Sequence, residues 1–107
     1  MKRGDLVTVA LQGDLGKPRP ALIVQADYYC DTTSVVILPV TSTLSNAPLL
    51  RLIVQPNQEN GLHKPSDIMI DKPSTVSRNK IGPSFGRLSD VQMMKVSRLL
   101  AVFMGIA

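Results

Sequence analysis

The apolar residues of this chain fall into short runs separated by glycine, proline and polar residues. Short runs rich in β-branched residues are typical of strands. The segments at 13–20 and 57–65 carry the glycine, proline and polar residues typical of loops. The run at 21–26 has few polar interruptions, which indicates a strand buried on both faces or a central strand. The pattern predicts strands at residues 6–11, 21–26, 34–40, 49–55 and 67–71, and a further short extended piece at 73–76.

The last part of the chain shows helical periodicity instead. Ser89 and Gln92 have the S-x-x-Q spacing of a capping box, and Asp90 would lie at the positive end of the helix. Gly105 is placed to end the helix. Several strands followed by one long helix predict a β-rich α+β fold, a small barrel packed by a C-terminal helix. The apolar face of that helix would consist of Met93, Val96, Leu100 and Phe103.

Length and composition narrow the class of protein. The chain has 107 residues, a length typical of a single domain spanning residues 1–107. Hydrophobic residues make up 44% of it, which indicates a globular rather than a disordered chain. The net charge of +4 favours anionic partners, although the cations are scattered and form no basic tail. With no Trp, two Tyr and two Phe, the chain has few side chains on which nucleobases could stack.

Cysteine and histidine each occur once, as Cys30 and His63. A single cysteine forms no intrachain disulfide, which fits a reducing compartment. These two residues are too few for a Cys/His metal site, and His63 is the only imidazole around which nucleophilic catalysis could be built. His63 stands in a polar loop, where a solvated side chain is the simpler interpretation. Because the chain also has no phosphate-binding glycine motif, neither a metal nor another cofactor is expected.

The N-terminus does not look like a secretory signal, since Lys2, Arg3 and Asp5 interrupt any early apolar run. No stretch approaches the roughly 18 apolar residues that span a bilayer. The protein is therefore expected to be cytoplasmic and without membrane contact.

The backbone of one cationic residue is restricted by its neighbours in the sequence, because Arg19 stands between Pro18 and Pro20. Proline fixes its own φ and pushes the residue before it toward extended backbone, so Lys17 and Arg19 are both expected to be extended. This segment would present the Arg19 guanidinium from a stiff backbone. An exposed turn arginine without a role fits the same residues.

Hydroxyl side chains cluster at the end of the run at 34–40, where Thr41, Ser42 and Thr43 follow one another. Such hydroxyls often cap turns by bonding to nearby backbone groups. Beside an arginine they also bind phosphate, to which the guanidinium presents a planar fork. Asp71, which precedes another proline-containing turn, is by default a turn residue.

Taken in order, these segments resemble the MazF/PemK/Kid family of toxins from type II toxin-antitoxin systems. The matching pieces extend over nearly the whole chain, and R-P-A-L-x-V-Q followed by P-V-T-S at this spacing is the most specific of them. The pieces are R-G-D-L at 3–6, R-P-A-L-I-V-Q at 19–25, L-P-V-T-S at 38–42, G-L-x-K-P-S-x-I-x-x-D at 61–71 and L-x-x-x-x-G-I at 100–106.

The resemblance implies a small SH3-like barrel with a C-terminal helix, as in CcdB, MazF and Kid, acting as a homodimer. It also implies a sequence-specific endoribonuclease that cleaves single-stranded RNA without a metal. The RNA 2′-OH would be the nucleophile, and the products would be a 2′,3′-cyclic phosphate and a 5′-OH. A cognate antitoxin, with an acidic or amphipathic flexible segment, would neutralise the toxin.

Residue by residue, the resemblance makes Arg19 the catalytic arginine and Thr41 the catalytic threonine. Ser42 would lie near the phosphate, and Asp71 falls where one branch of the family has an acidic residue implicated in RNA binding or cleavage. That branch often has an arginine two positions earlier, where this chain has Met69.

The chain also departs from the family in the loop before Arg19. This loop is shorter than in many members, and it has neither the Glu that they often carry nor the His that some of them carry. Because the loop of the family tends to border the RNA groove, the change bears on the RNA sequence that is cleaved and on the activity itself. Asp14 is a candidate to replace the missing acidic residue, and Lys17 is a candidate to contact phosphate.

Two other functions remain open. CcdB-type toxins share the expected architecture but poison DNA gyrase through a C-terminus that ends F-W-G-I. This chain ends Phe103-Met104-Gly105-Ile106 before its last residue, and it lacks the Trp that would anchor such an interface. The altered loop also leaves open a non-catalytic SH3-like module that binds RNA or protein.

Overall fold

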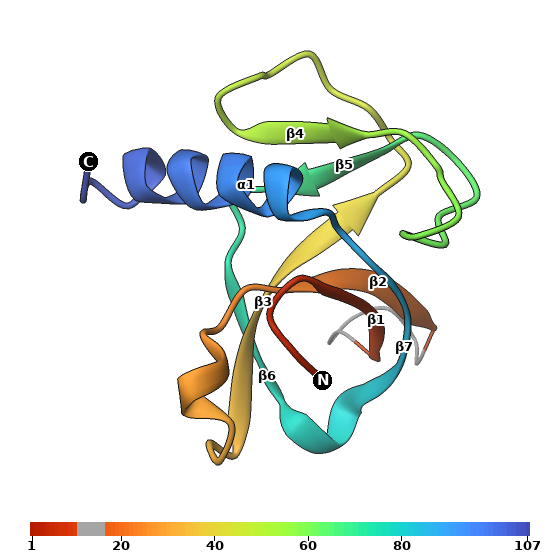
Figure 1. Ribbon diagram of the computed structural model, residues 1–107, viewed down its shortest axis with the longest axis vertical. Coiled ribbons are helices and arrows are strands. Elements are labelled where there is room, and N and C mark those ends of the chain that lie inside the picture. The colour runs from red at the N-terminus through yellow and green to blue at the C-terminus, as the bar shows by residue number, and fades with distance from the viewer. Residues whose placement is uncertain (11–16) are drawn as a thin grey trace.

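The structure is a computed structural model, and it describes residues 1–10 and 17–107. Within these residues, seven strands and one α-helix follow one another (Figure 1). Short 3₁₀ helices at Asp27–Tyr29 and Arg78–Lys80 connect some of them. The strands are β1 (Asp5–Ala10), β2 (Pro18–Ile23), β3 (Ser34–Thr41), β4 (Arg51–Val54), β5 (Ser66–Met69), β6 (Ser74–Ser77) and β7 (Ile81–Arg87), and the helix is α1 (Asp90–Phe103).

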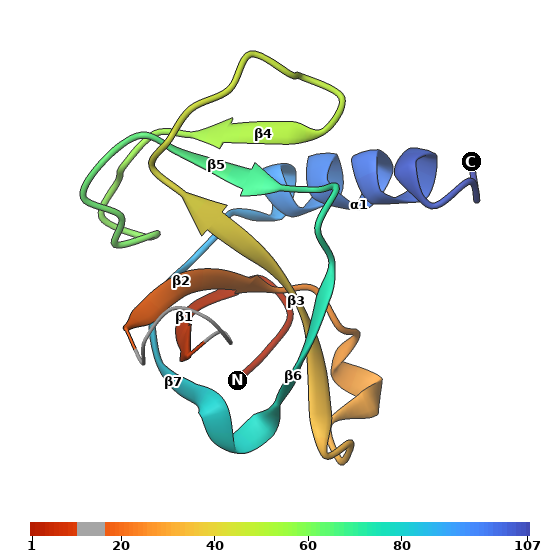
Figure 2. The ribbon, with the colours of Figure 1, turned by 180° about the vertical axis from the view of Figure 1, so that it is seen from behind.

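The strands pair antiparallel in the order β4-β5-β3-β2-β1-β7, and β6 pairs with β3 outside this path. The first half of β3 pairs with β6 and its last two residues, Val40 and Thr41, pair with β5. Figures 1 and 2 show the resulting arrangement, in which β4 and β5 lie beyond the end of β3 and α1 runs alongside them. The β-rich α+β class with a C-terminal helix is thus confirmed. Closure into a barrel stays a prediction, because the pairings of the described strands do not join β7 to β4.

Side chains of β1, β2 and β3 are buried on both faces of the sheet. Leu6, Leu22 and Leu38 lie opposite one another in the register and point into one core cluster, which α1 covers with Met93 and Val96. Their neighbours along each strand point the other way, because side chains alternate across a strand. The second cluster consists of Val7, Val9, Ala21, Ile23, Val35, Ile37 and Val76. The scarcity of polar residues in the predicted strand at 21–26 therefore reflects burial on both faces.

The helix begins and ends where the sequence predicts. Ser89 and Gln92 form the capping box, with the Gln92 N–H donating to Ser89 Oγ at 3.2 Å. Gly105 follows the last turn with φ +75°, a conformation that suits glycine. The predicted apolar face is buried at Met93 and Val96 but not at Phe103, which is exposed.

Pro18–Pro20 belong to β2, so the predicted loop at 13–20 is wrong at its C-terminal end. Pairing of β2 with β3 begins only at Ala21. The Val24 N–H donates to the Val36 carbonyl of β3. Since N–H groups alternate in direction along a strand, the nitrogens of both prolines also face β3. Proline has no N–H, so these two residues continue the pairing with β1 and end the ladder with β3.

Strand β7 is not among the predicted strands. Its sequence contains Gly82, Pro83 and Gly86, which are typical of turns. The glycines serve close packing instead. A Cβ at Gly82 would overlap Thr8 Oγ1, and a Cβ at Gly86 would overlap the Asn60 carbonyl. The predicted strands are found with their described ends shifted by at most three residues, and the last residue of the predicted strand at 6–11 lies outside the described residues.

The helix among the described residues is not long and apolar enough to cross a membrane.

Candidate active site

A cavity of about 550 Å³ lies where β2 and β3 stop pairing. Its volume is in the range of about 300–1,000 Å³ typical of small-molecule sites. The residues that line it come from β1, β2, the end of β3 and the loop after it, the segment that leads into β5, the start of β5, and β7. They include Arg19, Thr41, Ser42, His63, Lys64 and Phe85. Three of the residues singled out in the sequence, Arg19, Thr41 and Ser42, therefore converge on one cavity.

The strand register explains why Arg19 and Thr41 meet. Ala21 of β2 lies opposite Pro39 of β3. Continued by two residues along each antiparallel strand, this register would place Arg19 opposite Thr41. There β3 leaves β2 and pairs with β5 through Thr41 and Asp67, while Arg19 stays paired with β1. The two strands therefore separate next to both side chains, and the space between them is part of the cavity.

The Thr41 hydroxyl has a defined orientation. The Thr43 N–H donates to Thr41 Oγ1 at 3.1 Å, a turn in which a hydroxyl bonds the backbone two residues on. Because the oxygen accepts this bond, the hydroxyl proton can donate to another acceptor. A phosphate oxygen in the cavity is an acceptor of the right kind. The predicted turn-capping role of these hydroxyls and their predicted phosphate contact are thus compatible.

The loop that follows Thr41 is tied to β5 by a buried carboxylate. Asp67 is only 2% exposed, and its Oδ2 accepts the Ser45 N–H at 2.8 Å. Asp67 also lies opposite Thr41 in the pairing of β5 with β3. The sequence analysis did not single out Asp67. The available signal was an acidic residue within a predicted strand, where charged side chains are rarely buried without a partner.

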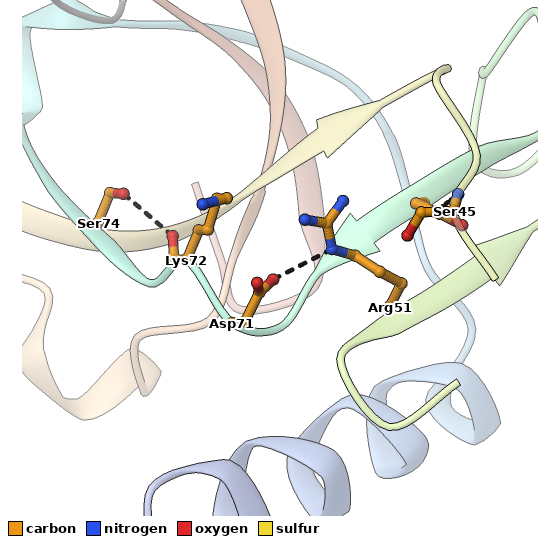
Figure 3. A network of polar contacts seen from close by, with 6 residues as sticks. Ser45, Arg51, Asp71, Lys72 and Ser74 are labelled. Atoms are coloured by element: carbon orange, nitrogen blue, oxygen red, sulfur yellow. Dashed lines mark hydrogen bonds and ion pairs between the residues drawn. The ribbon is translucent and has the colours of Figure 1, made fainter. Parts of the chain in front are cut away.

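Of the other predicted site residues, Asp14 is outside the described residues. Lys17 and Asp71 do not line the cavity. Lys17 is exposed just before β2. Asp71 follows β5 and accepts a bond from Arg51 Nε at 3.1 Å, in an ion pair that is largely shielded from solvent. Figure 3 shows Asp71 turned toward Arg51, with Lys72 beside it. The proposed roles of these three residues in binding RNA stay predictions.

His63 lines the cavity with an exposed side chain, so it is both solvated, as expected, and close to the predicted site. Lys64 and Phe85, which the sequence analysis did not select, line it as well. Among residues 1–10 and 17–107, no group of three or more His, Cys, Asp or Glu side chains could hold a metal ion.

Residues 2–104 match the family of PemK-like, MazF-like toxins of type II toxin-antitoxin systems. This chain is a member of that family. It is 44% identical over 108 residues to a probable endoribonuclease MazF of Mycolicibacterium smegmatis, an alignment that covers 100% of this chain and 99% of that protein. The resemblance drawn from the sequence motifs is therefore confirmed.

Solved structures show the same fold as this MazF-family chain. The toxin MazF-mt6 of Mycobacterium tuberculosis superposes with a TM-score of 0.82 at 22% identity, covering 96% of this chain and 98% of that one. An endoribonuclease from Mycobacterial species, solved in complex with its cognate antitoxin, gives a TM-score of 0.82 at 22% identity, with 100% and 97% covered. A MazE-MazF structure from Deinococcus radiodurans gives 0.77 at 21% identity, with 100% and 97% covered. The strands and C-terminal helix described above are thus a MazF-like fold.

Proposed function

We propose that this MazF-family toxin is an endoribonuclease that cleaves single-stranded RNA without a metal. The observation that carries the proposal is the meeting of Arg19 and Thr41 at one cavity, where β2 and β3 separate. The name of the M. smegmatis relative, a probable endoribonuclease, supports the same activity. The proposal treats residues 1–107 as one toxin domain with the small SH3-like barrel of this family.

The chemistry needs little from the protein because RNA supplies its own nucleophile. The 2′-oxygen attacks the adjacent phosphorus, the bond from phosphorus to the 5′-oxygen breaks, and a 2′,3′-cyclic phosphate and a 5′-OH remain. Arg19 would hold two phosphate oxygens with its planar fork and stabilise the charge that develops on them. Thr41 would donate its hydroxyl proton to one of these oxygens, and Ser42 would bind the phosphate nearby.

Proton transfer also needs an acceptor for the 2′-OH proton. A guanidinium is a poor base because it stays protonated. His63 carries the only imidazole of the chain and lines the same cavity. We therefore assign the proton acceptor to His63, and a water molecule would protonate the departing 5′-oxygen.

Arg19→Ala and Thr41→Val test the catalytic pair. The wild-type protein is expected to cut single-stranded RNA in EDTA and to leave cyclic phosphate ends. Each variant should lower kcat by about 10²–10³-fold, the usual cost of removing one group that stabilises a developing anion. Arg78→Ala is the matched control, because Arg78 Nε donates to the Thr32 carbonyl and the side chain does not line this cavity.

The outcomes separate the proposed nuclease from its alternatives. Full activity in Arg19→Ala, with an unchanged melting temperature, would contradict the assignment of the pair. Intact RNA together with trapped gyrase–DNA complexes would favour a CcdB-like gyrase poison. RNA that is bound but never cut would indicate a non-catalytic binding module.

The proposed partners follow from the same family. A relative has been solved in complex with its cognate antitoxin. For this chain we propose a homodimer and a cognate antitoxin with an acidic or amphipathic segment, which the net charge of +4 would attract. Light scattering should give twice the mass of one chain for the toxin alone.

A further inference from the structure

Phe85 forms an aromatic wall of the cavity that also contains Arg19 and Thr41. The chain has only four aromatic residues. Tyr28 and Tyr29 stack edge-to-face with each other, and Phe103 ends α1. Of the four, Phe85 is the one that lines this cavity, and it is 38% exposed. An apolar ring is therefore accessible next to the candidate phosphate site.

The backbone around Phe85 is shaped to fit the facing loop closely. Gly61 has φ +66°, a conformation that disfavours side chains. A Cβ at Gly61 would overlap the Phe85 carbonyl oxygen and would lie 3.2 Å from Phe85 Cδ1. The ring thus packs over a residue that has no side chain.

A buried asparagine fixes the loop that carries Gly61. Asn60 is fully buried, and its Oδ1 accepts the N–H groups of Asn57 at 3.1 Å and of Leu62 at 3.0 Å. Its Nδ2 donates to the Gln55 carbonyl at 2.9 Å. The loop is also bonded to β7, since the Arg87 N–H donates to the Glu59 carbonyl at 3.0 Å. Because side chain and backbone bonds hold this loop, the Phe85 ring has a rigid support.

We infer that Phe85 is a stacking platform for one nucleobase of single-stranded RNA, next to the scissile phosphate. This inference rests on the proposed nuclease function. Every nucleobase offers a π-face to an aromatic ring, and a ring held in place loses little entropy on binding. Lys64 lines the same cavity and adds positive charge for the neighbouring phosphate. The arrangement would fix the register of the RNA, so that one particular phosphate reaches Arg19 and Thr41.

A binding experiment that involves no cleavage tests this inference. The RNA carries a 2′-deoxy sugar at the mapped cleavage position, which removes the nucleophile. A 2-aminopurine base, whose fluorescence is quenched by stacking, is placed in turn at the nucleotide on the 5′ side and at the nucleotide on the 3′ side of the scissile phosphate. The wild-type protein should quench the base at one of these positions. Phe85→Leu, which keeps apolar packing over Gly61, should lose the quenching and bind about 5- to 50-fold more weakly.

Two variants serve as controls. Phe85→Tyr keeps the ring and should retain both quenching and affinity. Tyr28→Leu removes an aromatic residue that is 86% exposed and does not line the cavity, so it should change neither. The melting temperature checks that each variant is folded, and Phe85→Met replaces Phe85→Leu if the latter does not fold.

The result separates this inference from the proposed function. If the wild-type protein cleaves RNA while Phe85→Leu binds and quenches like the wild type, the stacking platform is wrong and the nuclease assignment stands. If the wild-type protein neither binds nor cleaves RNA, both are wrong. If Phe85→Leu weakens only the binding of the antitoxin, the ring contacts a protein partner and the inference is overturned.

Discussion

At the scale of single residues, the two prolines around Arg19 do more than stiffen a turn. Their nitrogens face β3, and their missing N–H groups end the ladder there. Arg19 remains paired with Val9 of β1, so its backbone is fixed while its side chain lines the space beside β3. Pairing with β1 positions Arg19, and the two prolines end the β2–β3 ladder so that the strands can separate beside it.

His63 is the proposed acceptor of the 2′-OH proton, so replacing its imidazole should remove this proton transfer. Because the Gln side chain is polar but is not a base, His63→Gln should lower kcat by about 10²–10⁴-fold and leave KM almost unchanged. Steady-state kinetics on a defined single-stranded RNA would measure both constants. A His63→Gln enzyme with wild-type kcat would show that another group accepts the proton.

At the scale of elements, the loop after β3 depends on β5. The buried Asp67 carboxylate accepts the Ser45 N–H and lies opposite Thr41. This contact links the loop that follows Thr41 to the neighbouring strand. The Thr41 oxygen is held by its local turn, and the loop that follows it is held by a tertiary contact.

Asp67→Ala is expected to loosen this loop. A lost hydrogen bond to a charged group costs about 1.5–3 kcal/mol, which for a chain of this size lowers Tm by roughly 4–8 °C per kcal/mol. Hydrogen exchange at the Ser45 amide should accelerate, and kcat should fall with it. Asp67→Asn keeps an acceptor oxygen and should restore most of the protection. Equal exchange at Ser45 in Asp67→Ala and the wild type would refute the link.

At the scale of the whole molecule, charge is spread over the chain and only part of it faces the cavity. The net charge is +4, and Arg19 and Lys64 line the cavity. RNA binding by a basic surface releases counterions and weakens as salt rises. The residues that contact phosphate should therefore contribute to the salt dependence, whereas distant cations should not.

Lys64→Gln tests this distribution of charge. The logarithm of the binding constant for an uncleavable single-stranded RNA should fall linearly with the logarithm of salt concentration. Removing one phosphate contact should reduce the slope by about 0.7. Lys95→Gln, at an exposed position of α1, should leave the slope unchanged. Identical slopes for Lys64→Gln and the wild type would place the RNA phosphates elsewhere.

The β-rich α+β class with a C-terminal helix and the family could be predicted from the sequence alone, and so could three of the residues that line the cavity, Arg19, Thr41 and Ser42. Short apolar runs, the capping box at Ser89 and the order of the motifs are local patterns, which a sequence displays directly. Strand β7 was missed because its glycines look like turn residues, and only its packing against Thr8 and Asn60 explains them. Packing of this kind joins residues far apart in the chain.

Which of the candidate residues share a cavity depends on the tertiary structure. Arg19 and Thr41 meet because the β2–β3 register brings them together where the ladder ends. Asp71 was also a candidate from the sequence, but it pairs with Arg51 and does not line the cavity. Phe85 had no motif to mark it, because its role depends on the loop at Gly61 that supports the ring. Register and close packing are properties of the folded chain, and local sequence patterns do not contain them.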